Sequence, residues 1–193
     1  MGTRWGGVDL AKRSDHSALV VLEVSDGRLN HIAEKLWGHV DYREVAEDLF
    51  RYHTKLKFNK VGFDRTGVGD AASEFFKPKN LYFPIITSNP KKIEMINLVQ
   101  SLFQQDKLRL QKGGELEKQI AEQTWNISPA GNLIYRHPSN SHDDLFWALC
   151  YSVYVAYPYL QGNVKIVARN SELDLTSLED KLEREMEKKL EWT

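Results

Sequence analysis

WGGVD, at residues 5–9, is the stretch that sets the fold, because a second run of the same kind, KVGFD, follows at residues 60–64. Each run is short, largely apolar and ends on an aspartate, which is typical of a buried strand that reaches a loop. Between them, residues 17–24 and 29–38 are predicted to be strands joined by the turn SDGR at residues 25–28. The first three strands therefore form an antiparallel meander.

An amphipathic helix is predicted between the third strand and the fourth. Asp41 and Glu44 form a capping box at its start. The apolar positions that follow share one helical face: Val45, Ala46, Leu49, Phe50 and His53. A strand, helix and strand in this order connect as parallel strands with a right-handed crossover. The fold class is thus α/β, with a mixed sheet of antiparallel and parallel strands flanked by helices.

The second half of the chain continues this alternation. The spacing and turn residues predict a helix over 67–77, a strand over 81–87, a helix capped by Asn89-Pro90, a helix over 115–123, a hairpin over 125–137 and a helix from Asp143 that Pro158 ends. The domain predicted from these elements spans residues 1–160. Residues 161–193 form a charged C-terminal tail, either helical or disordered, whose segment 163–193 carries six Lys/Arg and eight Asp/Glu.

Acidic residues stand where three of these elements begin or end. Asp9 and Asp64 close two parallel strands, and Asp143 and Asp144 open the last helix. Taken singly, an aspartate at the end of a strand is more often a turn or helix-cap residue than a metal ligand, and Asp143 or Asp144 could simply cap its helix. Carboxyl ends of neighbouring parallel strands meet at one edge of a sheet, so together they predict a cluster. Carboxylates that crowd one site resist ionising together unless a cation or protons neutralise them. The cluster therefore predicts a metal centre.

Residues beside these acids have possible supporting roles. Glycines at 6, 7 and 62 remove side chains and allow a backbone or substrate to approach closely. Asp15 is either a turn residue or a group near the ligands, and His142 is either a capping-region residue or a proton carrier. Phosphate contacts are predicted for basic residues that lie near the acids in sequence or are scattered beyond them: Lys12, Arg13, Arg65, Lys91 and Lys92.

Composition limits the alternatives. The 193 residues are 41% hydrophobic and 27% charged, with no apolar run of membrane-spanning length and no apolar leader at the start, so neither membrane insertion nor secretion is predicted. The lone Cys150 excludes an internal disulfide and a multi-thiolate zinc site. Histidines 31, 39, 53 and 137 show no paired ligand spacing, which does not favour zinc. Oxygen-only ligands favour magnesium, manganese or calcium.

Three separated motifs carry a resemblance to a known family. They are GVDLA at 7–11 with DHSA at 15–18, GFDRTGVGD at 62–70, and SHDD at 141–144 followed by Ala148-Leu149. In this order they resemble the nuclease domain of tailed-phage large terminase subunits. The resemblance runs from about residue 5 to residue 158.

That resemblance implies a ribonuclease H-like fold and an endonuclease that cuts concatemeric phage DNA in the host cytoplasm during genome packaging, outside the mature virion. Catalytic and metal-binding roles would fall on Asp9, Asp64 and Asp144, with Asp143 beside it, and two Mg²⁺ or Mn²⁺ ions would be held there. Partners would be double-stranded DNA, the terminase ATPase domain, the small terminase and the portal protein. The sequence contains no phosphate-binding GxxxxGK[ST] loop, so no ATPase activity is expected.

Other functions remain open at this point. A junction resolvase or transposase of the same fold would use the same acids on branched DNA or in strand joining. GVDL at residues 7–10 is also compatible with an actin-like phosphotransferase half, which would need a partner domain. A non-enzymatic module that docks on a portal or motor through its charged tail would bind only a structural ion.

Overall fold

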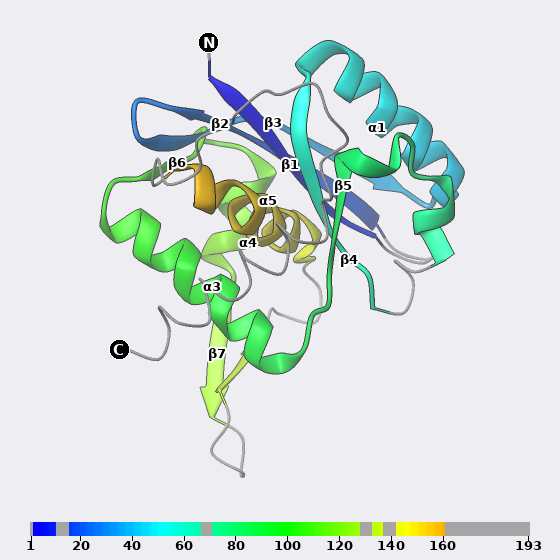
Figure 1. The fold of residues 1–193 in the computed structure, drawn as a ribbon. Helices are drawn as coiled ribbons and strands as arrows, with labels where there is room; N and C mark the ends of the chain where they lie inside the picture. The colour runs from blue at the N-terminus through cyan, green and yellow to red at the C-terminus, as the bar shows by residue number, and fades with distance from the viewer. Residues whose placement is uncertain (1, 11–15, 67–70, 128–132, 137–141, 161–193) are drawn as a thin grey trace.

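A six-stranded mixed sheet forms the centre of the protein in the computed structural model, which describes residues 2–10, 16–66, 71–127, 133–136 and 142–160 (Figure 1). Its strand order is β5-β4-β1-β2-β3-β6. The strands are β1 (Thr3–Asp9), β2 (His16–Ser25), β3 (Arg28–Gly38), β4 (Phe58–Asp64), β5 (Tyr82–Ile85) and β6 (Leu108–Arg109). β1, β2 and β3 pair antiparallel, and β4 pairs parallel with β1. The predicted mixed sheet is therefore confirmed.

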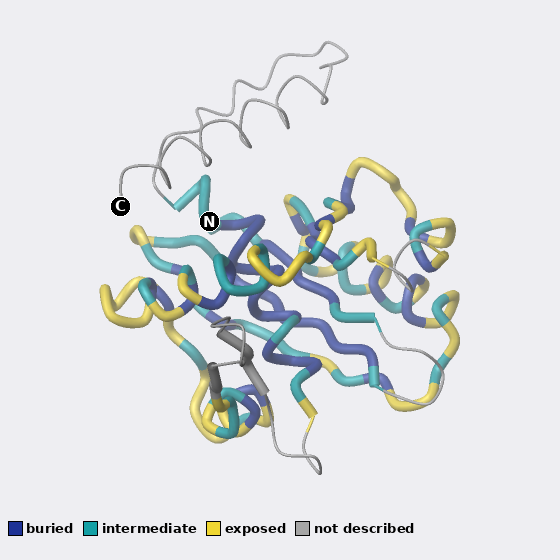
Figure 2. The backbone as a smooth tube through the Cα atoms, turned by 90° about the horizontal axis from the view of Figure 1, so that it is seen from below, coloured by how far each residue is buried: buried dark blue, intermediate teal, exposed yellow. Residues whose placement is uncertain are grey.

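Helices cover both faces of this sheet. They are α1 (Tyr42–Leu56), α3 (Asn89–Gln104), α4 (Glu115–Ala121) and α5 (Asp144–Leu160), together with the 3-10 turns η1 (Ser73–Phe75) and η2 (Lys79–Leu81). One core lies under α1 and contains Val8, Val45 and Leu49. The other lies under α3, α4 and α5 and contains Trp5 and Leu149. The molecule therefore has three layers, with the sheet between two layers of helices, and the buried residues concentrate in the middle (Figure 2).

Two glycines allow α5 to lie directly on the sheet. A Cβ atom placed on Gly7 would come within 2.0 Å of the Ala148 carbonyl oxygen, and one on Gly62 would come within 2.9 Å of the Tyr151 carbonyl oxygen. Neither distance leaves room for a side chain. The prediction that these glycines admit a close backbone is confirmed, and the backbone concerned is that of α5.

Helix starts and faces differ in detail from the sequence prediction. α1 does begin after Asp41, whose side chain accepts a hydrogen bond from the Arg43 N–H at 3.0 Å. Phe50, however, is 52% exposed, because it lies off the stripe that Val45 and Leu49 bury. Ser88, rather than Asn89, is the N-cap of α3, since its hydroxyl accepts from the Lys91 N–H.

Two predicted helix ends are wrong. A helix reaching residue 77 does not form, because the chain is extended at Phe76 and at Pro78, where the Lys77–Pro78 peptide is cis. Pro158 does not end α5, which continues to Leu160. Proline lacks the N–H that would bond to the carbonyl of Tyr154, so it removes one helical hydrogen bond, and α5 continues for only two residues beyond it.

The predicted hairpin is present as a separate two-stranded sheet. β7 (Thr124–Ile127) and β8 (Leu133–Arg136) pair antiparallel and extend away from the six-stranded sheet (Figure 1). The loop at 129–132 and the tail at 161–193 lie outside the described residues, so the predicted domain boundary stays a prediction. Within the described part of the chain, no helix combines the length and the apolar character needed to cross a bilayer.

Candidate functional site

Asp9 and Asp64 end two neighbouring parallel strands at the same edge of the sheet. In the register of β1 and β4, Val8 pairs with Phe63, so the two aspartates follow side by side. Side chains alternate between the faces of a strand, which places Asp9 on the same face as Gly7, and Asp64 on the same face as Gly62. Both carboxylates therefore project from the face that α5 covers.

The N-terminus of α5 brings a second pair of acids to this edge. The helix runs antiparallel to β1, because the Ser152 hydroxyl donates to the Trp5 carbonyl oxygen at 3.1 Å while Ala148 lies over Gly7. The first residues of the helix therefore lie beside the end of β1. Asp144 is 7% exposed there.

The charges of these four aspartates interact. Burial, followed by the negative charges of Asp144, Asp143 and Asp64, holds the pKa of Asp9 well above its usual range. The positive charge of Lys92 opposes this shift but does not cancel it. The structure thus brings together the acids that the sequence predicted to cluster, and their mutual repulsion makes the site one that a cation would stabilise.

Hydroxyl groups fix the position of Asp64. Its Oδ1 accepts hydrogen bonds from the Thr66 N–H at 2.8 Å and from the Thr66 hydroxyl at 2.6 Å. The Thr87 hydroxyl donates to Oδ2 of the same carboxylate and lies 3.1 Å from the Thr66 hydroxyl. Thr87 follows β5, the strand next to β4, so its role depends on sheet order and was not predicted from the sequence.

Asp143 is held by an aromatic residue of its own helix. The Trp147 indole N–H donates to Asp143 Oδ2 at 2.9 Å. The ammonium of Lys92, at the start of α3, lies 4.8 Å from the centre of the Trp147 ring, which is cation–π distance. The positive charge of Lys92 is therefore held at the margin of the acid cluster. From the sequence, Lys92 was one of several scattered basic residues.

Gln119 supplies the cap of α5. Its buried side-chain oxygen accepts from the Leu145 N–H at 2.9 Å and from the Phe146 N–H at 3.4 Å, which satisfies two N–H groups of the first helical turn. Capping by an aspartate was the alternative explanation for the acid pair. A residue of α4 therefore caps these two N–H groups.

Two histidines extend the cluster on one side. Ligand atoms of His16, His142 and Asp144 all lie within 4.8 Å of one another, and His142 Nδ1 is 3.8 Å from Asp144 Oδ2. The His16 and His142 ring centres are 4.8 Å apart. The prediction of oxygen-only ligands did not include these imidazoles. No ligand role was predicted for His16, although it lies in the DHSA motif, because its neighbour His142 is 126 positions away in the chain.

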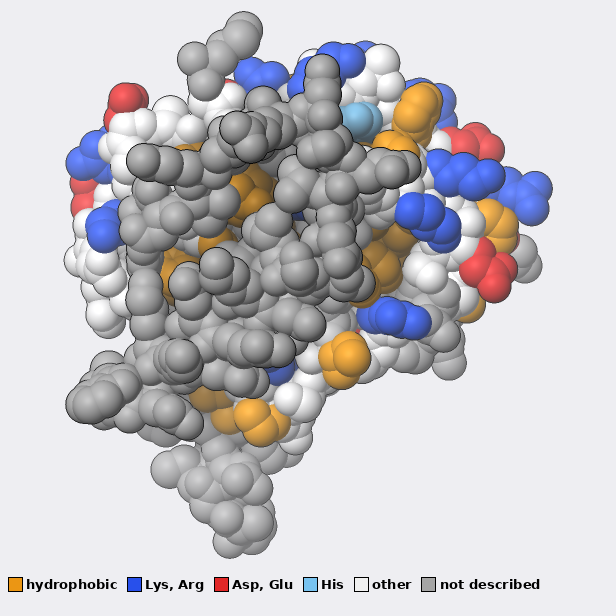
Figure 3. All heavy atoms as spheres, in the orientation of Figure 1, with side chains coloured by type: hydrophobic (Ala, Val, Ile, Leu, Met, Phe, Trp, Pro, Cys, Tyr) orange, Lys and Arg blue, Asp and Glu red, His pale blue; other side chains and the backbone are white. Residues whose placement is uncertain are grey.

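The predicted phosphate contacts have different surroundings. Lys12, Arg13 and Asp15 lie outside the described residues. Arg65 is exposed directly after Asp64, and the Lys91 ammonium lies 2.8 Å from Glu94 Oε2. In the uncovered parts of the face shown in Figure 3, Lys and Arg side chains lie at several separate places with acidic side chains among them. The observed charge pattern is mixed there.

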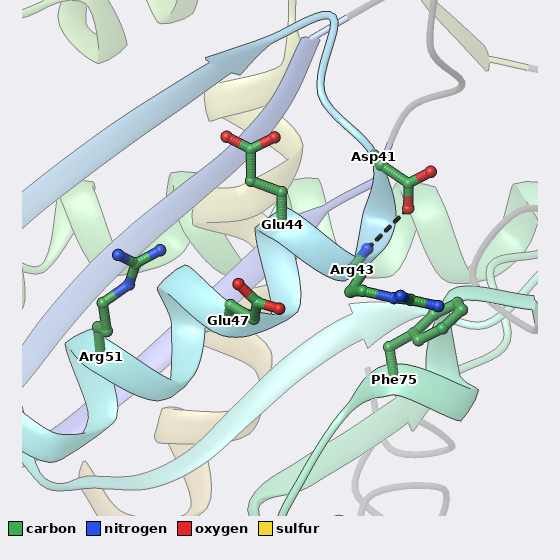
Figure 4. A pocket seen from close by; sticks show the side chains of 6 residues that line it. All are labelled: Asp41, Arg43, Glu44, Glu47, Arg51 and Phe75. Carbon is green, nitrogen blue, oxygen red and sulfur yellow. Dashed lines mark hydrogen bonds between the residues drawn. The ribbon is translucent and has the colours of Figure 1, made fainter.

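A pocket lies elsewhere, over α1 and η1 (Figure 4). Its lining residues are Asp41, Arg43, Glu44, Glu47, Arg51 and Phe75. The Arg43 guanidinium lies 5.4 Å from the centre of the Phe75 ring. None of the four clustered aspartates lines this pocket, which holds both charge signs in its wall.

Comparison with known proteins agrees with this arrangement. Residues 6–156 match the family model described as the terminase RNaseH-like domain. No curated protein matches the chain. Among solved structures, the large terminase nuclease from thermophilic phage G20c is similar, with 19% identity, a TM-score of 0.71, and coverage of 79% of this chain and 82% of that one. A structure of the same nuclease with bound magnesium matches equally well, at 19% identity and a TM-score of 0.71, covering 79% and 81%.

The large terminase of bacteriophage HK97 is also similar, with 16% identity and a TM-score of 0.67. The match covers 81% of this chain but 40% of the HK97 protein. These structural likenesses show the ribonuclease H-like fold.

Proposed function

This chain belongs to the terminase RNaseH-like domain family, and from that premise we propose that it is a divalent-metal-dependent endodeoxyribonuclease. Its substrate in this proposal is concatemeric phage DNA, which it cuts during genome packaging. The proposal concerns phosphodiester hydrolysis alone, since ATP hydrolysis would need a nucleotide-binding motif that the sequence does not contain.

One observation carries the proposal: four aspartates lie at one edge of the sheet, at the ends of β1 and β4 and at the start of α5, where the charges of three of them raise the pKa of Asp9. Such repulsion does not stabilise a folded protein, whereas a cation site requires concentrated negative charge. Carboxylate oxygens are the ligands that Mg²⁺ and Mn²⁺ prefer. The magnesium that occupies the related G20c nuclease supports the same choice here.

Each aspartate has a distinct place in the proposed mechanism. When bound, two cations would polarise the scissile phosphate and lower the pKa of a water molecule. Asp9, on which the charges of the other three acids act, is the residue proposed to contact both ions. Asp64, held by Thr66 and Thr87, would hold one ion, and Asp144 would hold the other. Asp143, fixed by Trp147, would orient water or complete one ligand set.

Lys92 is proposed to meet the DNA backbone at this site. Its ammonium rests over the Trp147 ring and acts on the charge of Asp9, so it lies near the place where a scissile phosphate would bind. Arg65, exposed beside Asp64, and Lys12 and Arg13, outside the described residues, are proposed as further backbone contacts. Contacts of this kind predict binding that falls steeply with salt and depends little on sequence.

Cleavage of supercoiled plasmid tests the proposal. The purified chain should nick and linearise plasmid in Mn²⁺ or Mg²⁺ and not in EDTA, and Asp64→Asn should lower the rate by at least about a hundredfold, because a ligand of one ion is lost. Asp26→Asn is the matched control, since Asp26 is exposed in the turn between β2 and β3. Equal rates for wild type and Asp64→Asn would contradict the proposal.

The substrate separates this proposal from other enzymes of the same fold. We expect linear and supercoiled duplex DNA to be cut at rates similar to that of a four-way junction. A strong preference for the junction would instead favour a resolvase. The chain spans 40% of the HK97 large terminase, and joint action with an ATPase domain, a small terminase and a portal protein is part of the proposal.

A further inference from the structure

A group of imidazoles adjoins the carboxylate cluster, and its composition differs from that of the cluster. His16 begins β2, next to β1 in the sheet, and His142 lies just before α5. Their ligand atoms and that of Asp144 lie within 4.8 Å of one another. Each of the three side chains, all in the described part of the chain, offers one ligand atom to a shared ion at these separations.

We propose that His16, His142 and Asp144 form a separate cation site that takes a transition-metal dication of the zinc or cobalt type. Imidazole nitrogen is a good ligand for these ions, while Mg²⁺ and Ca²⁺ select oxygen ligands. Two histidines and one carboxylate, with water in the remaining position, are a ligand set that zinc commonly uses. The site is distinct in ligand chemistry from the one proposed for Mg²⁺.

The geometry requires only a small movement to reach metal-binding distances. Zinc–nitrogen bonds of about 2.0–2.1 Å place tetrahedral ligand atoms roughly 3.3 Å apart. The separation between His142 Nδ1 and Asp144 Oδ2 is 3.8 Å, already near this value. The His142 side chain is 56% exposed, and its ring meets the His16 ring edge to face, so rotation of the exposed ring changes mainly its contact with the other proposed ligand. His16 is paired with Gly38 across β2 and β3 and supplies a fixed partner.

Asp144 connects this site to the proposed catalytic one. Its carboxylate has two oxygens, and one of them, Oδ2, faces His142. An ion held by the histidines would therefore change the negative charge available to the ions beside Asp9. The existence of the histidine site does not depend on DNA cleavage, so it can be tested by binding alone.

Titration with Co²⁺ in an excess of Mg²⁺ tests the site directly. Excess Mg²⁺ competes for the oxygen ligands, and the position and intensity of the visible d–d absorption, together with calorimetry, then distinguish Co²⁺ bound through imidazole from Co²⁺ bound by carboxylates alone. We expect one Co²⁺ per chain, displaced by Zn²⁺. His142→Ala should weaken Co²⁺ binding by more than about tenfold, since loss even of an indirect metal contact costs that much. His142 is exposed, so this variant should fold.

His16→Asn should have the same effect, and His39→Asn is its matched control. The His39 ring lies 5.6 Å from that of His16 but is outside the three-residue group. Asp64→Asn, which removes a proposed catalytic ligand, should leave the Co²⁺ absorption in place. Absorption that is lost in both histidine variants and kept in the controls supports the site, whether or not plasmid is cut. Unchanged Co²⁺ affinity in His142→Ala and His16→Asn would overturn it, even for an active nuclease.

Discussion

Asp9 lies where three other carboxylates raise the free energy of its charged form. Burial and the charges of Asp144, Asp143 and Asp64 all act in the same direction, and Lys92 opposes them. A cation bound there would relieve this repulsion, so the proposed metal-bound protein would be more stable than the protein without metal. Each unit by which a pKa is raised corresponds to about 1.4 kcal/mol between the two protonation states. The cost of assembling the site is therefore measurable as stability.

In the absence of metal, Asp9→Asn should raise the melting temperature, by an amount that grows with pH. The folded-state pKa of Asp9 lies above its unfolded value of about 3.9, so the folded state keeps a proton that the unfolded state has released. Stability from this group is present below the unfolded pKa and is lost as pH rises through the folded pKa. Melting curves in EDTA between about pH 5 and 8 would measure the difference.

Asp26→Asn provides the control for the same measurement, because that residue is exposed and remote from the cluster. An Asp9→Asn chain that melts below wild type at every pH would show that Asp9 stabilises the fold by its charge, which would argue against a repulsive cluster.

α5 is the element that assembles the site, and the glycines of β1 and β4 determine how closely it lies. Gly7 faces the Ala148 carbonyl oxygen and the Ser152 N–H, while Gly62 faces Tyr151. These contacts are with backbone atoms, which cannot move aside as a flexible side chain can. The position of Asp143 and Asp144 relative to Asp9 therefore depends on two residues that take no part in chemistry.

Gly7→Ala should destabilise the protein strongly. Its Cβ would lie 2.0 Å from the Ala148 carbonyl oxygen and 2.3 Å from the Ser152 nitrogen, so α5 would have to move away from the sheet. Overpacking of this kind costs about 1–3 kcal/mol, and here the upper end or more is expected, because backbone must shift. Urea denaturation would measure the free energy of unfolding.

Gly38→Ala is the matched control for a strand glycine. The nearest atoms to its Cβ, in the His16 ring, would lie at an ordinary contact distance of 3.5 Å. A change under about 1 kcal/mol is expected there. Equal stability of Gly7→Ala and wild type would mean that α5 does not lie as close to β1 as the structure has it.

The molecule as a whole is one sheet with a core on each face. The core under α1 and the core under α3, α4 and α5 are both built from residues between 5 and 160, and the family match ends at residue 156. Residues 163–193 contain fourteen charged side chains, six basic and eight acidic. A segment of this composition adds little buried apolar area. The proposed domain boundary near residue 160 is therefore open to a direct test.

A chain that ends at Leu160 should unfold cooperatively at nearly the melting temperature of the full chain. Loss of the tail should change stability by less than about 1 kcal/mol, which is roughly 2–4 °C for a protein of this size. Calorimetry of both chains would measure the shift. A chain that ends at Ser152 is the control, because it removes the buried Val153, Val155 and Ala156 and should not fold. A much larger shift in the Leu160 chain would place the tail within the folded unit.

Much of the candidate site could be predicted because its main residues stand at element ends. Asp9 and Asp64 follow apolar strand runs, and Asp144 opens an apolar helix, so periodicity and connection rules bring them to one edge. The supporting residues could not be predicted in this way. Thr87, Gln119 and His16 act through strand order and helix packing, and they touch partners that lie 23, 26 and 126 positions away in the chain.

The sequence by itself indicated the mixed sheet, most of the element order and the positions of the four aspartates at element ends, because hydrophobic period, turn residues and crossover handedness are local properties of a chain. It did not predict β6, which is only two residues long. Only the tertiary structure decided how the aspartates are held. Threonines of separate loops fix Asp64, a glutamine of α4 caps α5, and Pro158 is accommodated within that helix. These outcomes depend on the distances between packed elements, since long-range contacts are set by the balance of all packing contacts and leave no pattern in neighbouring residues.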